Sequence, residues 1–280
     1  MAKIIAAALL YTFLALPALA QQAGRIDLID GEVRIINAKA QTRIAQLGEA
    51  VNQGDTVTTG RNGEAHLKMD DGGMLAIRPD ARLSIVKFQS KGHDSDVSLV
   101  SLARGALRAI SGWIGRRSPD RVNIQTPTAT IGIRGTDHEV VVVPEGSSEG
   151  QPGTYDKVNA GGTRLSSERG VVDVSPGQAA FASPTAAPTV LATIPEDIFK
   201  PSRNDSRLEG LNERLQRSPE SRSFIVPAPP GGRGAAGAGK SGGVQIQGNT
   251  RINAAAKDTN AIAIGQDNEV GNSIGTIGGK

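Results

Sequence analysis

Apolar and polar residues alternate in short runs through most of the first 182 residues, and Gly, Asp-Gly or Pro stands between the runs. Alternation with a period of two is typical of β-strands that bury one face, and such punctuation marks turns. The runs that predict strands are residues 31–36, 56–59, 65–69, 74–77, 83–88, 97–102, 105–110, 122–125, 129–131, 139–143, 170–174 and 178–181. Regularly spaced short strands favour a mainly β fold, either a β-sandwich or a β-roll of solenoid-like character.

The β domain is expected to span residues 21–182, but one stretch inside it breaks the alternation. Residues 144–161 are rich in Gly, Pro, Ser and Asp, so we predict a loop insertion there. The last two strand-like runs follow this insertion and are expected to form a hairpin that completes the domain.

A different pattern begins after residue 182. Leu208, Leu211 and Leu215 recur at helical spacing, and Ser206 with Glu209 fits a capping box. We therefore predict a linker over residues 183–226 that contains one short amphipathic helix. Its leucines are expected either to pack on the β domain or to bind a partner.

The last part of the chain has low complexity. Residues 227–243 are a predicted linker, because ten of the seventeen are Pro or Gly. Residues 244–280 repeat Asn, an apolar residue and Gly in a loose rhythm. This repeat-like tail fits stacked short strands or a disordered polar tail, and its composition leaves both readings open.

The first twenty residues have the features of a secretory signal peptide. Lys3 precedes the apolar run Ile4–Leu16, Pro17 ends the run, and Ala18 and Ala20 supply small residues for cleavage. The alternative is an uncleaved anchor, although the run is shorter than the ~20 residues of a membrane span. No later stretch is apolar enough to span a membrane, so we expect an exported protein in the periplasm or at the cell surface.

Composition excludes several classes of function. The chain has no cysteine, which excludes disulfides, thiolate metal ligands and a thiol nucleophile. With one Trp, two Tyr and five Phe, it lacks the aromatics of a platform for stacking bases. A formal net charge of +3 does not indicate nucleic-acid binding. We therefore expect no nucleic-acid partner.

No motif indicates catalysis, a cofactor or a metal. Residues 234–241 match the P-loop expression, but Pro and Gly flank them in place of a strand and a helix. His66, His93 and His138 do not share ligand spacing, and His66 alternates with apolar neighbours as a solvent-facing residue would. Residues 146–150 have the letters of a nucleophile elbow but lie in a predicted loop. These features predict a non-enzymatic protein.

Basic residues gather over eighteen positions around one tryptophan, with a single acid among them. Because arginine suits paired recognition of carboxylate and phosphate, this run is a candidate contact for an acidic envelope protein or an anionic envelope polymer. The alternative is a solvated surface with scattered ion pairs. The candidate binding residues are Arg104, Arg108, Trp113, Arg116, Arg117 and Arg121.

Several short motifs then occur in an order that resembles the FecR domain family, over residues 25–143. They are Gly31-Glu-Val33, Leu47-Gly48, Val51, Gly54 to Gly60, Asp71-Gly72, Leu75, Pro79, Gly105 to Arg108, Thr126 to Ala129 and Gly132 to Thr136. The resemblance implies structural roles at turns and close backbone approaches, with Arg134 and Thr136 tying the last turn. The fold-motif residues are Gly54, Asp55, Gly60, Gly105, Pro127, Arg134, Gly135 and Thr136. One departure is His138, where the family pattern has an aromatic or apolar residue.

The resemblance also implies a class of function. Family members with a role in iron signalling carry a cytoplasmic anti-sigma segment and a membrane helix, in whose place this chain has the predicted signal peptide. We therefore expect a stand-alone exported module that binds an envelope protein or ligand, with signalling or sensing as its context. Asn260 to Gly265 is similar to head repeats of trimeric autotransporter adhesins. The alternative is thus a structural or adhesive surface protein that self-associates through the tail.

Overall fold

The computed structural model describes residues 21–217. The chain divides into two units, residues 1–226 and 227–280, and all described residues belong to the first. The predicted signal peptide, Pro/Gly linker and repeat-like tail lie outside the described residues. The helical elements are α1 (Trp113–Arg117), η1 (Pro119–Arg121), η2 (Asp205–Arg207) and α2 (Leu211–Arg217). The strands are β1 (Gln22–Asp30), β2 (Val33–Ile36), β3 (Thr42–Ile44), β4 (Ala50–Asn52), β5 (Thr56–Thr59), β6 (Glu64–Met69), β7 (Met74–Ile77), β8 (Arg82–Gln89), β9 (Val97–Ile110), β10 (Val122–Gln125), β11 (Thr130–Ile133), β12 (Asp137–Val143), β13 (Gly153–Ala160), β14 (Thr163–Ser167), β15 (Gly170–Val174), β16 (Ala179–Ala182) and β17 (Thr189–Val190).

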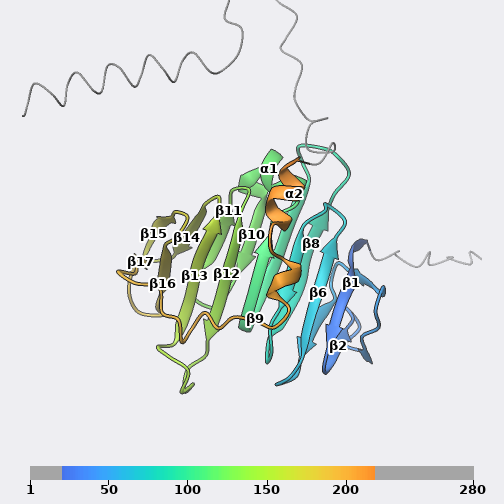
Figure 1. Cartoon of the computed structure of the whole chain (residues 1–280), viewed down its shortest axis with the longest axis horizontal. Coiled ribbons are helices and arrows are strands. Elements are labelled where there is room, and N and C mark those ends of the chain that lie inside the picture. The colour runs from blue at the N-terminus through green and yellow to red at the C-terminus, as the bar shows by residue number, and fades with distance from the viewer. Residues whose placement is uncertain (1–20, 218–280) are drawn as a thin grey trace, which may run out of the picture. The chain divides into compact units, whose positions relative to one another are not determined.

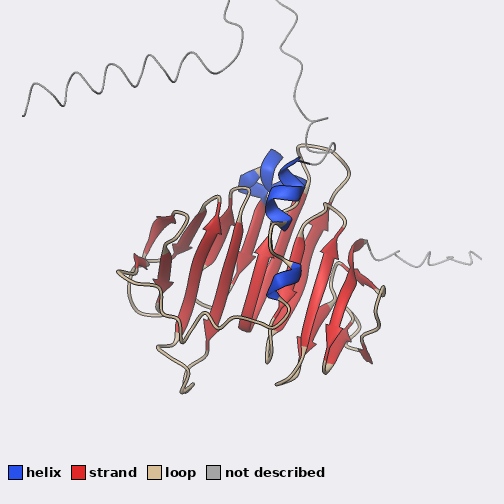
Figure 2. Cartoon of the chain, viewed as in Figure 1, coloured by secondary structure: helices blue, strands red, loops and turns tan. Residues whose placement is uncertain are grey.

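The strands form two sheets packed face to face (Figures 1 and 2). Sheet A has the order β4-β1-β6-β7-β9-β12-β13-β16-β17, with every pair antiparallel. Sheet B has the order β3-β2-β5-β8-β9-β10-β11-β14-β15, in which only β9 and β10 run parallel. The chain moves from one sheet to the other after every one or two strands. The predicted mainly β fold is confirmed as a sandwich.

Strand β9 belongs to both sheets and bends at Gly105. Residues 97–104 pair with β8 in sheet B, while residues 105–110 pair with β7 and β12 in sheet A. Gly105 has φ +82°, and a Cβ there would stand 2.5 Å from the Cα of Ala81. Only glycine fits this bend. Two separate strands were predicted here, and the structure joins them into one.

The main core lies between the sheets and explains the alternation in the sequence. Successive side chains of a strand point to opposite faces, so each strand sends every second residue inward. In β9 these are Leu107 and Ala109, and in β12 they are Val140 and Val142. The alternate residues face outward, and on sheet A that outer face is also covered.

The cover is the segment of residues 191–217, here called the strap, which crosses the outer face of sheet A (Figure 1). Two apolar clusters hold it. Ile198 and Phe199 pack on Tyr155 and its neighbours, and Leu208 is 1% exposed against Met74 and Ile110. The leucines of the predicted helix therefore pack on the β domain.

Two local predictions were wrong. The predicted loop insertion contains β13, which pairs with β12 on one side and β16 on the other. Its Gly, Tyr and Asn content concealed a central strand that long-range pairing stabilises. Helix α2 begins at Leu211, after Gly210 with φ +64°, so Ser206 and Glu209 do not form its capping box. Among the helices described, none is both long and apolar enough to cross a membrane.

Candidate functional site

Charged residues line the outer face of sheet A beneath the strap. They occupy alternate positions on central strands, which place Glu64 and His66 of β6 on the same face as Glu139 of β12. Opposite charges face each other across strands, since Glu139 lies opposite Arg108 on one side and Lys157 on the other. Lys157 Nζ lies 2.7 Å from Glu139 Oε1. This complementarity stabilises the register of the sheet.

Glu64 joins the sheet to the strap. Its Oε1 accepts hydrogen bonds from Arg78 Nη1 and His66 Nε2, each at 2.8 Å. Its Oε2 accepts hydrogen bonds from Ser202 Oγ and, at 3.0 Å, from Asn204 Nδ2 of the strap. Burial raises the pKa of Glu64, but these hydrogen bonds and the Arg78 charge lower it more, to about 2. The carboxylate therefore stays ionised down to strongly acidic pH.

A second carboxylate, on the strap itself, completes this network. Asp205 pairs with Arg78 Nη2 and lies 3.6 Å from Arg108 Nη1. Arg108 in turn holds Asp137 through two hydrogen bonds of 2.9 and 2.8 Å. Arg78 is only 6% exposed, so its two carboxylate partners are needed to offset the cost of burying its charge.

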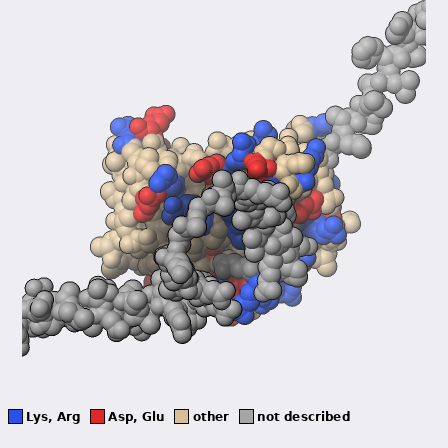
Figure 3. All heavy atoms as spheres, turned by 90° about the horizontal axis from the view of Figure 1, so that it is seen from above, with Lys and Arg blue, Asp and Glu red and all other residues tan. Residues whose placement is uncertain are grey.

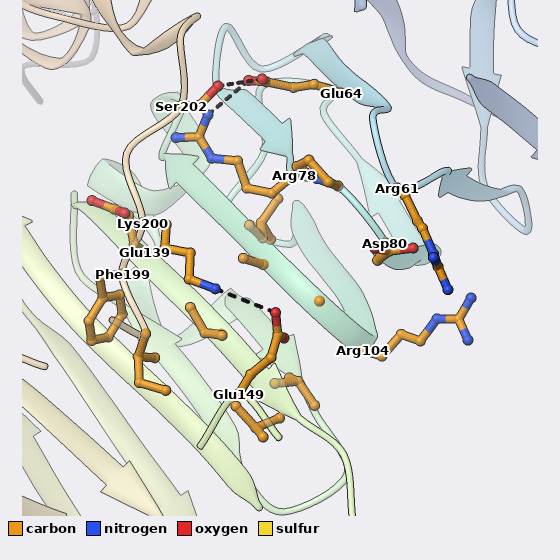
Figure 4. A pocket seen from close by; sticks show the side chains of 18 of the residues that line it. Arg61, Glu64, Arg78, Asp80, Arg104, Glu139, Glu149, Phe199, Lys200 and Ser202 are labelled. Atoms are coloured by element: carbon orange, nitrogen blue, oxygen red, sulfur yellow. Dashed lines mark hydrogen bonds and ion pairs between the residues drawn. The ribbon is translucent and has the colours of Figure 1, made fainter. Parts of the chain in front are cut away.

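A cleft of about 820 Å³ opens between residues 197–203 of the strap and the sheet, where the loop after β7, the bend of β9 and the end of β12 line it (Figure 4). Apolar side chains form part of its lining, among them Val141, Val143, Ile198 and Phe199. Glu64, Arg78 and Ser202 close one end. At the rim, Lys200 of the strap lies 3.5 Å from Glu149, which follows β12.

Another side of the cleft carries unpaired cations. Figure 4 shows the guanidinium groups of Arg61 and Arg104 pointing toward one another, with the Asp80 carboxylate beside them. All three side chains are exposed, and within residues 21–217 no hydrogen bond or ion pair joins any of them to a partner. The cross-strand partner of Arg104 is Arg82, also exposed. Arg61, Arg82 and Arg104 are here called the arginine cluster.

Comparison with known proteins identifies the central part of the sandwich. Residues 55–152 match the family model described as FecR protein. These residues are a FecR domain. They include β5 to β12 and thus the sheet side of the cleft, while the strap comes from outside the match. The resemblance drawn from the sequence over residues 25–143 is confirmed, with the match placed further along the chain.

Solved structures give weaker likenesses. Two crystal structures of a "putative anti-sigma factor" from Parabacteroides distasonis are 13% identical, with TM-scores of 0.41 and 0.40. The alignments cover 50% of this chain and 61% of that chain, so this chain spans less than two thirds of that protein's length. A "cell surface anchoring domain" is 31% identical over 22% of this chain and 82% of its own, with a TM-score of 0.22. These scores are too low to carry an argument, and no curated protein matches the chain.

The candidate binding residues from the sequence do not converge on one surface. Arg104 joins the arginine cluster, whereas Arg108 is bound to Asp137 under the strap. Trp113 is half-buried and packs against the main core. The remaining three lie beyond the other end of β9, on or beside α1 and η1; they are Arg116, Arg117 and Arg121.

The end of the FecR domain that bears α1 carries mixed charge. Arg117 Nε lies 2.7 Å from Asp94 and also donates a hydrogen bond to the carbonyl of Gly92. Burial lowers the pKa of Arg116, which the nearby Asp71 charge partly offsets. Seen from above, acidic side chains stand among the basic ones on the uncovered part of this surface (Figure 3). This end is not a uniformly basic surface.

The fold-motif residues hold turns and the bend of β9. Gly54 and Gly135 have positive φ values of +90° and +56°. Thr136 is fully buried, and its Oγ1 donates a 2.8 Å hydrogen bond to the carbonyl of Gly162. Asp55 is 4% exposed and accepts the backbone N–H of Asn52. The other members of the set are Gly60, Gly105, Pro127 and Arg134, of which Pro127 and Arg134 are exposed.

The histidines differ from expectation. His66 does not face solvent, since the strap leaves it 1% exposed and Glu64 binds it. His138 is fully buried inside the FecR domain, where Nδ1 lies 2.7 Å from Asp156 Oδ1 and the other oxygen of Asp156 accepts a hydrogen bond from Thr163. The family's apolar position is thus filled by a buried polar pair. In the described part of the chain, no three His, Asp or Glu residues group as metal ligands.

Sequence reasoning missed the cleft because its walls come from distant segments. Arg61, Arg78 and the strap residue Ser202 are separated by up to 141 positions, the distance from Arg61 to Ser202. The sequence does contain one signal for this site, the turn Gly60-Arg-Asn-Gly63, in which Arg61 and Asn62 are exposed. The antiparallel pairing of β5 with β8 and of β8 with β9 is what places that turn next to Arg104.

Proposed function

We propose that the chain is an exported, non-enzymatic binding module that holds a segment of a partner protein in the cleft. The observation that carries this proposal is the cleft of about 820 Å³, with apolar side chains in its lining and charged residues at its rim. Cavities of this size with a few fixed polar groups are typical of binding sites. The FecR domain supplies the rigid sheet, and the strap supplies the second wall.

The strap supports a protein segment as the occupant. Residues 197–203 already lie along sheet A as a segment of irregular backbone that begins in a turn at residues 196–198, with Ile198 and Phe199 on the apolar cluster around Tyr155. Tyr155 and Phe199 meet edge to face, with ring centroids 6.5 Å apart. A segment of a partner protein beside the strap would meet the same kind of surface.

The state of the polar groups supports binding rather than catalysis. The carboxylates of Glu64 and Glu139 are held by ion pairs, and neither stands free to move a proton. The His138–Asp156 pair has the composition of a catalytic dyad, but both side chains are 0% exposed. A substrate would not reach them.

The proposal includes a location outside the cytoplasm and a biological role. The signal-peptide pattern of residues 1–20 supports a place outside the cytoplasm, in the periplasm or at the cell surface. There the module would bind an envelope protein, in a signalling or sensing role. The adhesive alternative rests on the tail, residues 244–280, and remains a prediction from the sequence.

The absence of cysteine gives a direct test. A single cysteine at Ser147, which lines the cleft, can carry a maleimide-benzophenone crosslinker in cells. The matched control is Ser101→Cys, which lies in β9 between inward-facing Val100 and Leu102 and so faces outward from sheet B. Irradiation followed by mass spectrometry would identify the crosslinked proteins.

We expect Ser147→Cys to capture a discrete protein that Ser101→Cys does not. Crosslinks of equal yield from both positions would contradict the cleft as the binding site. Capture of a second copy of this chain through residues 244–280 would favour the adhesive alternative. Fractionation of the same cells would test export independently.

A further inference from the structure

The backbone that carries the arginine cluster is held rigidly beside the cleft. The turn that carries Arg61 is tied to the next loop, since the N–H of Asp80 donates to the carbonyl of Gly60 at 3.1 Å. Thr59 Oγ1 accepts the N–H of Ala81 at 2.9 Å, and Gly105 packs directly on Ala81. Arg61, Arg82 and Arg104 therefore project from three segments that cannot move apart easily. Binding a ligand would require ordering of the arginine side chains but not of the backbone that carries them.

The arginine cluster is also electrostatically unfavourable while no anion is bound to it. Arg82 and Arg104 are direct cross-strand partners, and like charges directly opposite each other destabilise a sheet. Arg61 adds a third positive charge, and Arg61 and Arg104 are the two members of the cluster that line the cleft. The one acid beside them is Asp80, which forms no ion pair with any of the three in the structure described. An anion bound between the guanidinium groups would remove this repulsion.

We propose that the arginine cluster binds a carboxylate on the partner's segment, so that the cleft recognises an acidic residue followed by apolar residues. The proposal rests on the proposed function, because it names the chemistry that the same cleft selects. The carboxylate would lie between Arg61 and Arg104, and the apolar side chains would rest near Val141, Val143 and Phe199. Guanidinium groups suit this role because they bind both oxygens of a carboxylate at once.

The choice of a carboxylate follows from the proposed occupant. Asp80 stands beside the cluster, so three positive charges face one negative charge before the ligand binds. A phosphate with nearly two negative charges would be attracted more strongly by the guanidinium groups as well as repelled more strongly by Asp80, so charge does not separate the two anions. Asp and Glu carry a carboxylate without any modification, so this is the anion that an unmodified protein segment supplies. The Glu149 carboxylate on the rim is already paired with Lys200.

The test uses a random peptide library displayed on phage and panned on the purified protein. We expect enriched peptides with Asp or Glu next to apolar residues. The affinity of an enriched peptide is then measured against its Asn or Gln counterpart. Replacing the acid should weaken binding about 10- to 100-fold, the range for hydrogen bonds to charged groups. Raising the salt concentration should also weaken binding of the acidic peptide.

Variants locate the contact. The double variant Arg61→Ala with Arg104→Ala should bind the acidic peptide about 10- to 100-fold more weakly, and should no longer distinguish it from its neutral counterpart. Arg25→Ala is the control, because Arg25 is exposed on β1 and does not line the cleft. All three substituted positions are exposed, and circular dichroism melting checks that each variant folds.

The outcomes separate this inference from the proposed function. Enriched peptides that protect the cleft from crosslinking at Ser147→Cys but show no acidic preference would overturn the carboxylate site and leave the cleft as a binding site. Peptides that bind elsewhere, or no enrichment at all, would overturn both. A preference for phosphorylated over carboxylate peptides would also overturn the inference as stated.

Discussion

The substitution Glu64→Gln tests whether a buried carboxylate holds the strap on sheet A. Glutamine keeps one oxygen to accept from His66 and Arg78, but it removes the negative charge. Its side-chain amide also places N–H groups opposite Ser202 and Asn204, which in the wild-type protein donate hydrogen bonds to Glu64. Arg78 would keep only Asp205 as a charged partner.

The magnitude follows from linkage. The pKa of Glu64 falls from 4.5 to about 2 in the folded state, which corresponds to a ceiling of about 3 kcal/mol of stability at neutral pH. The side chain is 5% exposed, yet it lines an open cleft where water screens its charge. We therefore expect Glu64→Gln to lower the free energy of unfolding by about 2 kcal/mol at pH 7.

The pH dependence gives a sharper test than the magnitude. Because the folded pKa is lowered, the stability due to Glu64 is present above pH 4.5 and is lost as pH falls toward 2. Glutamine imitates the protonated acid, so wild type and variant should converge in stability over that interval. Urea denaturation at pH 7, 5, 4 and 3 measures this convergence, and hydrogen exchange shows whether residues 191–217 open first.

The matched control is Glu32→Gln, whose exposed ion pair with Arg34 should contribute less than about 1 kcal/mol. If Glu64→Gln cost no more than Glu32→Gln, the carboxylate would not hold the strap. A loss of stability that stayed constant from pH 7 to pH 3 would refute the linkage argument.

Three further predictions address the core contacts of the strap, the bend of β9 and a second buried acid. Leu208→Ala should lower the free energy of unfolding by about 2–4 kcal/mol and speed hydrogen exchange in the strap, since Leu208 is 1% exposed. Unchanged exchange would mean that this contact does not hold the strap. Gly105→Ala should lower the free energy of unfolding, measured by thermal denaturation, by about 1–3 kcal/mol or more. The reason is that the new Cβ would lie 2.5 Å from Ala81 at a residue whose φ is +82°. A variant of wild-type stability would show that the bend tolerates a side chain. Burial raises the pKa of Asp71 from 3.8 to about 6, so its effect on stability becomes more unfavourable as pH rises through that interval. Asp71→Asn keeps an oxygen that can accept the N–H of Gly73, and its stability relative to wild type should increase between pH 4 and pH 7. Parallel profiles of unfolding free energy against pH would contradict the raised pKa.

Much of the local structure could be predicted because alternation is a local signal. The runs at 56–59, 74–77, 122–125 and 170–174 became β5, β7, β10 and β15 with the same bounds. A strand that buries one face in the core must place apolar residues at every second position, whatever its partners are. The FecR motifs were equally local, since turns require particular residues at particular positions.

Prediction failed where stability comes from contacts between distant residues. Strand β13 has a turn-like composition but is held between β12 and β16. His66 has the position of a solvent-facing residue, yet the strap buries it and Glu64 binds it. In both cases burial and pairing override local preference.

Patterns along the sequence are enough to establish that this protein is mainly β, carries FecR motifs and has a leucine stripe at helical spacing after the β domain. That β9 serves both sheets, that the strap covers sheet A, and that Arg61 and Arg104 meet at the mouth of a cleft emerges from the folded chain alone. The difference arises because strand period and turn chemistry act between neighbours in sequence. Sheet order, burial of charge and the shape of a cleft depend on which distant segments pack together.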